Sequence, residues 1–335
     1  MKHKQHDNPA KPHTQFNRPN HRYGIAEVVE QLCAPAESEL THYGLHYRNM
    51  LLPSRHRVIE CTEELKSVLF PGFFGYREFE EDTLRFHIGS TLDQVLYILR
   101  HEIDIALRFV DGYSYEHEYA RPEQLDDVLQ AFVHTLPEIR RKLLLDARMC
   151  YEWDPASFIP EAPIFCYPNV HAMINYRLAH ELYQLGVPFI SRIITEHAHS
   201  QTGIDIHPGA QIGESFFVDH GTGVVIGQTA IVGDRVRLYQ GVTLGAKSFP
   251  IDERTGWPQK GIPRHPIIED DVVIFAEATV LGRVTIGHHS VIGANVFLAR
   301  SVPPYSKVYQ APVRITNGDA AAGPPAPEDD RVGGG

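Results

Sequence analysis

IEDDVVIFAEATVLGRVTIGHHSVIGANVFLARSVP, residues 268–303, repeats a pattern every six positions. Each block of six opens on an aliphatic residue and has a small or branched residue at its fifth position. The opening residues are Ile268, Ile274, Val280, Ile286, Ile292 and Leu298, and the fifth positions are Val272, Ala278, Val284, Ser290, Val296 and Val302. This period fits neither a helix nor a half-buried strand. It is typical of a three-sided coil of short parallel strands, whose aliphatic residues point inward and stack from turn to turn.

The same register continues upstream, so the predicted coil is longer than this stretch. Further aliphatic residues open blocks at Ile206, Ile212, Val218, Ile226, Val232, Leu238 and Leu244. Because one turn of such a coil cannot bury a core alone, several turns must stack. We therefore predict a coil over residues 204–303. Four prolines and three glycines between Leu244 and Ile268 interrupt the pattern and indicate a loop excursion, residues 246–266.

Residues 23–203 have the apolar periodicity of helices. Ser90, with Asp93 three positions later, resembles the N-cap of one of them. Pro122 predicts the first turn of another, and the segment Gly186-Val187-Pro188 predicts the end of a third. The predicted fold class is therefore α+β, with an all-helical N-terminal domain followed by the coil.

Composition limits the classes of partner and the compartment. The net charge of −11 and the absence of a basic tract argue against binding to nucleic acid or to a membrane surface. No apolar run is long enough for a membrane span, and the N-terminal residues lack the apolar core of a signal peptide. Residues 1–22 and most of 304–335 are predicted to be disordered tails. The widely spaced cysteines predict reduced thiols in the cytoplasm; they are Cys33, Cys61, Cys150 and Cys166.

Three motifs with histidine fall on or beside the predicted coil. They are Asp205-Ile206-His207-Pro208, Asp219-His220-Gly221 and Arg264-His265-Pro266. His220 comes just after an inward position, near a corner, and Asp205 lies about one turn earlier. A carboxylate beside one imidazole nitrogen leaves the other free to accept a proton from a hydroxyl, which suits general-base catalysis of acyl transfer.

Other interpretations of these histidines stay open from the residues alone. Each could cap a turn, and Pro208 favours that interpretation for His207. A zinc site is a further alternative, but the coil contains no HxH or HxxxH pair, and acyl transfer of this kind needs no metal.

The combination of motifs resembles serine O-acetyltransferase, of the hexapeptide-repeat acyltransferase superfamily. The resemblance rests on DIHPGAQIGESFFVDHGTGVVIGQTAIVGDRVRLYQGVTLGA, residues 205–246, on the later RHP segment and on further hexads. The upstream segments WDPA at Trp153–Ala156 and HAMINYR at His171–Arg177 are similar to segments of the same family. The hexads alone are shared by sugar, antibiotic and lipid acyltransferases. The resemblance implies that the coil is a left-handed parallel β-helix.

The resemblance also implies roles for single residues. His220 would be the general base that takes the proton of the serine hydroxyl, and Asp205 would orient its imidazole. The hydroxyl would then attack acetyl-CoA directly, without an acyl-enzyme. Asp154 and Asp219 would hold the serine ammonium, although Asp154 could equally cap a helix or turn.

The remaining implied roles concern the carboxylate of serine and the coenzyme. Arg264 and His265 would hold that carboxylate, and His265 could also stabilise the oxyanion at the thioester carbonyl. The small residues Gly245, Ala246 and Ala276 would let the pantetheine arm lie close to the coil. No metal is implied, and L-cysteine, which differs from serine by one atom, is expected to compete at the serine site as an inhibitor.

The family packs three coils in parallel, with sites between neighbours, so we expect a homotrimer or a dimer of trimers. Many members also dock cysteine synthase through a C-terminal tail that ends in isoleucine. This chain ends in Gly333-Gly334-Gly335, which argues against that partner. Ala246 replaces a usual glycine, and Gln228 a usual glutamate.

Two other functions remain as alternatives at this point. One is acetyl transfer to another hydroxyl or amine, such as that of a sugar, which would not need both Arg264 and Asp154. The other is a non-catalytic scaffold that senses cysteine, which would have no need of the His220–Asp205 pair.

Overall fold

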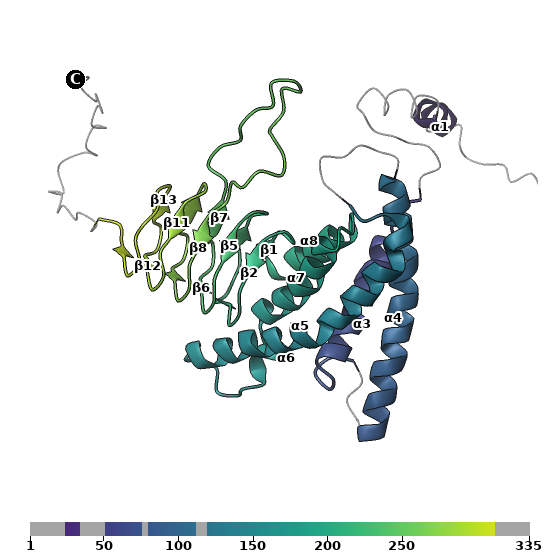
Figure 1. The fold of residues 1–335 in the computed structure, drawn as a ribbon, viewed down its shortest axis with the longest axis horizontal. Helices are drawn as coiled ribbons and strands as arrows, with labels where there is room; N and C mark the ends of the chain where they lie inside the picture. The colour runs from purple at the N-terminus through teal and green to yellow at the C-terminus, as the bar shows by residue number, and fades with distance from the viewer. Residues whose placement is uncertain (1–23, 34–50, 76–79, 112–118, 312–335) are drawn as a thin grey trace, which may run out of the picture. The chain divides into compact units, whose positions relative to one another are not determined.

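The computed structural model describes residues 24–33, 51–75, 80–111 and 119–311 (Figure 1). The chain divides into two compact units, Met1–Leu51 and Leu52–Gly335. In the first unit the described residues form helix α1 (Ile25–Cys33). The predicted tail 1–22 lies outside the described residues, as does the part of the predicted C-terminal tail beyond residue 311.

The second unit begins with helices, as the sequence predicts. They are α3 (Arg55–Leu69), α4 (Glu81–Val110), the 3-10 helix η2 (Pro122–Gln124), α5 (Leu125–Trp153), α6 (Ala162–Cys166), α7 (Pro168–Gln184) and α8 (Ile190–Thr202). Pro122 opens η2, and α7 ends just before Gly186, which confirms both boundary predictions. The predicted cap at Ser90 is wrong, because α4 already begins at Glu81. The Ser90 hydroxyl donates to the Phe86 carbonyl at 2.8 Å, a bond that a serine inside a helix can make.

The helices are followed by short parallel strands. They are β1 (Asp205–Ile206), β2 (Gln211–Ile212), β3 (Phe217–Val218), β4 (Val225–Ile226), β5 (Ile231–Val232), β6 (Arg237–Leu238), β7 (Thr243–Gly245), β8 (Ile267–Ile268), β9 (Val273–Ile274), β10 (Thr279–Leu281), β11 (Thr285–Ile286), β12 (Val291–Ile292), β13 (Phe297–Leu298) and β14 (Lys307–Val308). Between β7 and β8 lies the predicted excursion, which Figure 1 shows as a long loop that leaves the row of strands.

The strands form three parallel sheets, and the chain visits the sheets in turn. The first sheet has the order β1-β4-β7-β10-β13, the second β11-β8-β5-β2 and the third β14-β12-β9-β6-β3. Up to β13, every strand therefore pairs with the strand three places along the chain, whereas β14 pairs with β12. We call the corners that lead from the third sheet to the first the third–first edge, and those that lead from the first to the second the first–second edge.

The residues that open the hexads form the core of the coil, which confirms the inward positions predicted from the sequence. All are 8% exposed or less: Ile206, Ile212, Val218, Ile226, Val232, Leu238, Leu244, Ile268, Ile274, Val280, Ile286, Ile292 and Leu298. Each stacks on its counterpart one turn away; Val232, for example, pairs with Ile268 across the excursion.

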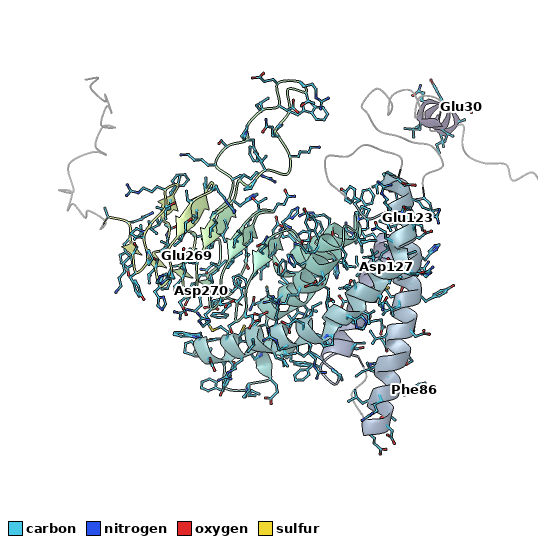
Figure 2. The ribbon with its side chains drawn as sticks, in the orientation of Figure 1. Glu30, Phe86, Glu123, Asp127, Glu269 and Asp270 are labelled. Atoms are coloured by element: carbon cyan, nitrogen blue, oxygen red, sulfur yellow. The ribbon has the colours of Figure 1, made fainter. Side chains whose placement is uncertain are left out.

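Acidic side chains close the corners between the second and third sheets. Asp234 Oδ1 accepts a hydrogen bond from the Glu214 N–H at 2.8 Å, and Asp270 Oδ1 accepts one from the Asp234 N–H at 2.9 Å. Glu269 Oε2 accepts one from the His288 N–H at 2.7 Å. Figure 2 shows Glu269 and Asp270 on the coil. These bonds satisfy backbone donors at the corners that the short strands leave unpaired.

A buried ion pair joins the helices to the first turn of the coil. Arg177 of α7 donates to both carboxylate oxygens of Asp146 of α5, at 2.8 and 3.0 Å. The guanidinium also donates to the Gly213 carbonyl at 2.8 Å, and Asp146 Oδ1 accepts from the Phe216 N–H at 2.9 Å. Asp146 is 0% exposed and Arg177 5%. Because these helices and the strands belong to one compact unit, the division into domains at residues 203 and 303 stays a prediction; β14 lies beyond the second boundary.

Candidate active site

His220 lies on a two-residue insertion in the third–first edge. The corner between β3 and β4 has six residues, whereas the corner between β6 and β7 has four. The Gly241 N–H donates to the Thr222 carbonyl at 2.9 Å, so the corner from Thr222 onward follows the regular pattern. The two extra residues are therefore His220 and Gly221, and the coil keeps its register by extruding them.

The conformation of the insertion directs His220 into solvent. His220 has φ 57° and Gly221 has φ 85°, both in the left-handed region. A Cβ on Gly221 would lie 2.5 Å from Ile204 Cδ1, so this position requires glycine for space as well as for φ. The imidazole is 72% exposed, and its Nε2 lies 3.9 Å from Asp219 Oδ1. The structure therefore brings Asp219 and His220 together.

Asp205 is close to this corner along the backbone, because it follows Ile204, on which Gly221 packs. No hydrogen bond or ion pair joins its carboxylate to the His220 imidazole in the described part of the chain. The orientation of His220 by Asp205 therefore stays a prediction.

His265 lies on the first–second edge, where Thr229 positions it. The Thr229 N–H donates to His265 Nδ1 at 3.1 Å, and the Thr229 hydroxyl lies 2.9 Å from the same nitrogen. The Thr229 hydroxyl oxygen also accepts from the backbone N–H groups of Arg264 and His265, at 2.9 and 3.2 Å. A Cβ at Gly227 would lie 2.0 Å from the ring, so the imidazole lies against the backbone there. Since Nδ1 accepts a backbone N–H, the neutral ring carries its proton on Nε2.

The charge state of His265 follows from its surroundings. The residue is 7% exposed. Burial, and then the positive charges of Arg264 and Arg283, lower the pKa of His265 to about 4. Near neutral pH the ring is therefore uncharged and its Nε2–H is a hydrogen-bond donor.

This pKa predicts how stability depends on pH. An unfolded histidine titrates near pH ~6.5, so between that pH and about 4 the unfolded chain binds more protons than the folded chain at His265. The contribution of the neutral ring is complete above the unfolded value and is lost as the pH falls through this window. We expect the free energy of unfolding to fall accordingly, and to fall less steeply in His265→Gln. Urea unfolding at several pH values measures both slopes; equal slopes would contradict the prediction.

Arg264 is held beside the His265 backbone with its guanidinium partly available. Its Nη2 donates to Gln228 Oε1 at 2.8 Å and its Nη1 to the Ile262 carbonyl at 3.3 Å. Gln228 Nε2 in turn donates to the Tyr183 hydroxyl at 2.9 Å. A guanidinium has five N–H donors, so this arrangement leaves donors for a carboxylate.

Asp154 forms the C-cap of α5. Its Oδ1 accepts from the Ala156 N–H at 2.8 Å, and its Oδ2 accepts from the Tyr167 hydroxyl. The turn-capping interpretation is thus correct for one oxygen, and the binding of a substrate ammonium by Asp154 stays a prediction. His207 also serves a turn, since its Nδ1 accepts from the Gly209 N–H at 2.9 Å.

The predicted site residues at the corners of the coil divide between two edges, whereas Asp154 lies at the end of α5 and Asp205 in β1. His220 and Ala276 follow third-sheet strands, on the third–first edge. Gly245 and Ala246 lie at the end of β7, on the first–second edge. His265 and Thr229, which positions it, lie on the same edge. The width of the first sheet separates the two groups, so a single chain does not bring His220 and His265 together.

Sequence reasoning missed the residues that hold His265 and Arg264. These are Gly227, Gln228, Thr229 and Arg283, whose Nη1 donates to the Thr229 carbonyl at 2.7 Å. Their position in the repeat could have identified the first three. They directly follow the inward residue Ile226, one turn of the coil before the RHP segment. Among the described residues, no group of three or more His, Cys, Asp or Glu side chains could hold a metal ion. None of the helices in the same ranges could span a bilayer.

Comparisons with known proteins agree with the motifs. The family model of the bacterial transferase hexapeptide (six repeats) matches residues 265–300. The chain is 47% identical over 318 residues to the plasmid serine acetyltransferase of Synechococcus elongatus, a match that covers 94% of this chain and 98% of the relative. It is 45% identical over 187 residues to the serine acetyltransferase of Mycobacterium tuberculosis, with 56% of this chain and 77% of the relative covered.

A solved structure supports the same assignment. Serine acetyltransferase 1 of Entamoeba histolytica, in complex with L-cysteine, superposes with a TM-score of 0.65 at 37% identity, covering 74% of this chain and 86% of that chain. The identity with the Synechococcus relative extends over almost the whole of both chains, through the helices as well as the coil. The chain therefore belongs to the serine acetyltransferase family.

Proposed function

We propose that this protein transfers the acetyl group of acetyl-CoA to the hydroxyl of L-serine, giving O-acetylserine and free coenzyme A for cysteine biosynthesis. The observation that carries the proposal is the two-residue insertion that presents His220 beside Asp219. A scaffold would gain nothing from an exposed imidazole held in a left-handed conformation at this corner. The names of the relatives give the acceptor as serine.

In the reaction His220 acts as the general base. It removes the proton of the serine hydroxyl while the oxygen attacks the thioester carbonyl of acetyl-CoA. The tetrahedral intermediate then collapses, the carbon–sulfur bond breaks, and the imidazolium returns its proton to the departing thiolate. Asp205 orients the imidazole and stabilises its positive charge. No acyl-enzyme forms, because both substrates react while bound together.

The charges around the two motifs suit an amino acid. Asp219 and Asp154 bind the serine ammonium, and the free donors of Arg264 bind its carboxylate. His265 is suited to stabilise the oxyanion, because its uncharged ring keeps a proton on Nε2. A sugar would need neither the cation nor the anion partner.

The complete site forms between two copies of the chain. His220 lies on the third–first edge and His265 on the first–second edge, so each needs a neighbour to supply the other. Three parallel coils placed around a threefold axis put these edges against each other at three equivalent clefts. We therefore propose left-handed coils that assemble as a homotrimer, or as a dimer of trimers.

Acetyl-CoA lies in the same cleft. Ala276 is on the edge that carries His220, whereas Gly245 and Ala246 are on the edge that carries His265. Small side chains on both walls leave room for a pantetheine arm. L-cysteine competes with serine there, in keeping with the cysteine complex of the Entamoeba relative. The cytoplasmic location stays a prediction from the sequence.

Replacing Arg264 with glutamine tests the assignment of the acceptor. The loss of a charged hydrogen bond to the carboxylate should raise KM for L-serine by about 10- to 100-fold. KM for acetyl-CoA should stay within about twofold, since the proposal assigns this side chain to the acceptor and not to the coenzyme. Initial rates of thiol release measure both. An unchanged KM for serine would remove Arg264 from the acceptor site.

A further inference from the structure

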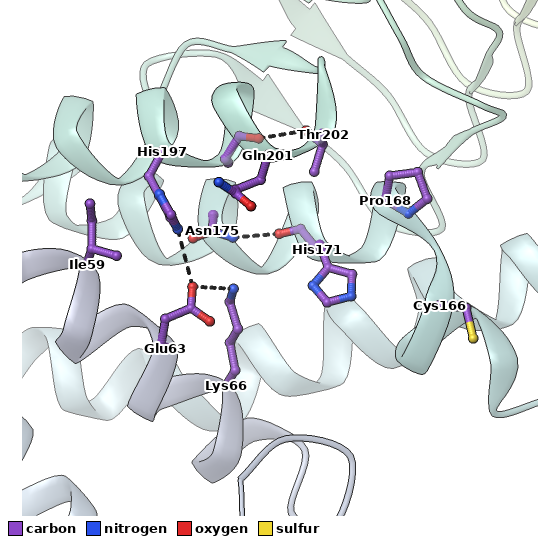
Figure 3. A pocket seen from close by; sticks show the side chains of 11 residues that line it. Ile59, Glu63, Lys66, Cys166, Pro168, His171, Asn175, His197, Gln201 and Thr202 are labelled. Carbon is purple, nitrogen blue, oxygen red and sulfur yellow. Dashed lines mark hydrogen bonds and ion pairs between the residues drawn. The ribbon is translucent and has the colours of Figure 1, made fainter.

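Helix α7 lines two pockets, and the charged groups beside them differ. One pocket, of about 590 Å³, lies among α3, α7 and α8 (Figure 3). Lys66 Nζ donates to Glu63 Oε1 there at 2.6 Å, and His197 Nε2 lies 3.5 Å from the same oxygen, so these groups pair with each other. The other pocket, of about 310 Å³, lies between the end of α7 and the coil. Its lining includes Tyr183, Gly209, Gln211 and Gln228.

In this second pocket, Gln228 links α7 to Arg264. Arg264 Nη2 donates to Gln228 Oε1 at 2.8 Å, and Gln228 Nε2 donates to Tyr183 Oη at 2.9 Å. Because a guanidinium can only donate, Gln228 must turn its carbonyl oxygen toward Arg264 and its amide nitrogen toward Tyr183. The chemistry of the three groups therefore fixes the direction of both bonds.

The backbone at Gly209 leaves room for this pair of side chains. A Cβ at Gly209 would lie 3.0 Å from Tyr183 Cε1 and 3.2 Å from Gln228 Cγ. Gly209 is not among the residues with positive φ, so its backbone conformation does not demand glycine. The missing side chain at this position therefore serves the packing of Tyr183 and Gln228.

The orientation of Arg264 depends on Gln228. In the described part of the chain, the guanidinium makes one other hydrogen bond, from Nη1 to the Ile262 carbonyl at 3.3 Å. Ile262 is two residues away in the same excursion, whereas Gln228 lies on the coil itself, shortly after β4. No carboxylate pairs with Arg264 within the described ranges, in contrast to Lys66. Gln228 therefore orients a cation whose remaining donors can bind an anion.

We propose that Tyr183 and Gln228 are positioning residues for the acceptor, which hold the Arg264 guanidinium in the orientation that binds the carboxylate of L-serine. The inference rests on the proposed function, in which Arg264 binds that carboxylate. The pair acts through Arg264 and not through contact with the substrate. It favours acceptors that carry a carboxylate, and through Tyr183 it makes the affinity for serine depend on α7.

Replacing Gln228 with leucine removes the acceptor of Arg264 and keeps a side chain of similar size. KM for L-serine should rise about 3- to 10-fold, less than after the loss of Arg264 itself, and kcat should stay within about twofold. Gln228→Glu should restore KM to within about twofold of the wild type, because a carboxylate accepts from Arg264 and the Tyr183 hydroxyl can donate to it. Initial rates of thiol release measure all of these constants.

Two more variants separate the pair from its surroundings. Tyr183→Phe keeps the ring but removes the acceptor of Gln228 Nε2, so KM for L-serine should rise about two- to fourfold. Gln211→Leu is the matched control. Gln211 lines the same pocket, but in the described part of the chain its side chain makes no hydrogen bond. KM for L-serine should be unchanged in this control.

Two further measurements show whether the pair acts through Arg264. L-serinamide lacks the carboxylate, so KM for it should be equal in the wild type and in Gln228→Leu. The double variant Gln228→Leu and Arg264→Gln should have the KM for L-serine of Arg264→Gln alone, because a positioning residue has no effect once its target is gone.

Additive losses in the double variant would overturn the inference. So would an equal KM for L-serine in Gln228→Leu and in a wild type that acetylates serine, and the proposed function would then stand. A wild type without turnover of serine would overturn the proposed function and this inference with it.

Discussion

Replacing His220 with alanine should lower kcat with L-serine by about 10²- to 10⁴-fold, the usual contribution of a positioned general base. Without the imidazole, the hydroxyl proton has no acceptor as the oxygen attacks the thioester. The fold should be preserved, because the side chain is 72% exposed. Steady-state rates of thiol release from acetyl-CoA, with saturating serine, measure the effect.

His289→Ala is the matched control. His289 has φ 58°, nearly the value of His220, and a side chain that is 49% exposed, but it lies at a different corner of the coil. Its kcat should stay within about twofold of the wild type, which separates lost chemistry from lost conformation at a left-handed residue. Turnover in His220→Ala equal to that of the wild type would mean that another group accepts the proton.

Replacing Arg177 with methionine should reduce the free energy of unfolding by about 3–5 kcal/mol, which would make it one of the most damaging single changes in the chain. The variant leaves the Asp146 carboxylate buried without its cation, and it also removes the hydrogen bond to the Gly213 carbonyl. Since that contact joins α5 and α7 to the first turn of the coil, the loss should appear in the main cooperative transition. Urea unfolding followed by far-UV circular dichroism measures it.

Arg141→Met, on the helix α5 that also carries Asp146, provides the comparison. Arg141 also pairs with acidic side chains, Glu138 and Glu214, but these pairs lie at the surface. Its loss of stability should be much smaller, because water replaces the lost partner. The double variant Asp146→Leu and Arg177→Met should be more stable than Arg177→Met alone, since it no longer buries an unpaired charge. If Arg177→Met and Arg141→Met are equally mild, the buried pair is not what holds the helices to the coil.

The coil could be predicted from the sequence because its core depends on one repeated local rule. Each inward residue is set by a six-residue period, and all of them are buried as expected. The same pattern contained the clue to the insertion: Val218 and Ile226 are eight positions apart instead of six. This longer spacing shows where His220 and Gly221 are inserted. The spacing therefore identifies His220 as a candidate site residue, in addition to its motif.

The helical region was less predictable, because its boundaries depend on tertiary packing. Ser90 has the sequence signature of a cap, but α4 continues through it, and the serine bonds back to its own helix. The contacts of Thr229 and Gly227 with the His265 imidazole could not be deduced from the sequence either. Deducing them requires knowing that the chain returns from a long excursion to the turn directly above those residues. The pairing of Asp146 with Arg177 joins two different helices. No periodic pattern in the sequence indicates it, so it could not be predicted.

Co-expression of two inactive variants tests most directly whether His220 of one copy works with His265 of another. His220→Ala and His265→Ala chains, each expected to be nearly inactive alone, are given different tags, and the mixed oligomers are isolated through both. Every trimer that contains both variants has one cleft, of its three, that combines an intact His220 with an intact His265 from the neighbouring chain, so about a third of the clefts are complete. The account predicts recovery of activity toward that fraction of the wild-type value. Activity no greater than that of the two parents would contradict it.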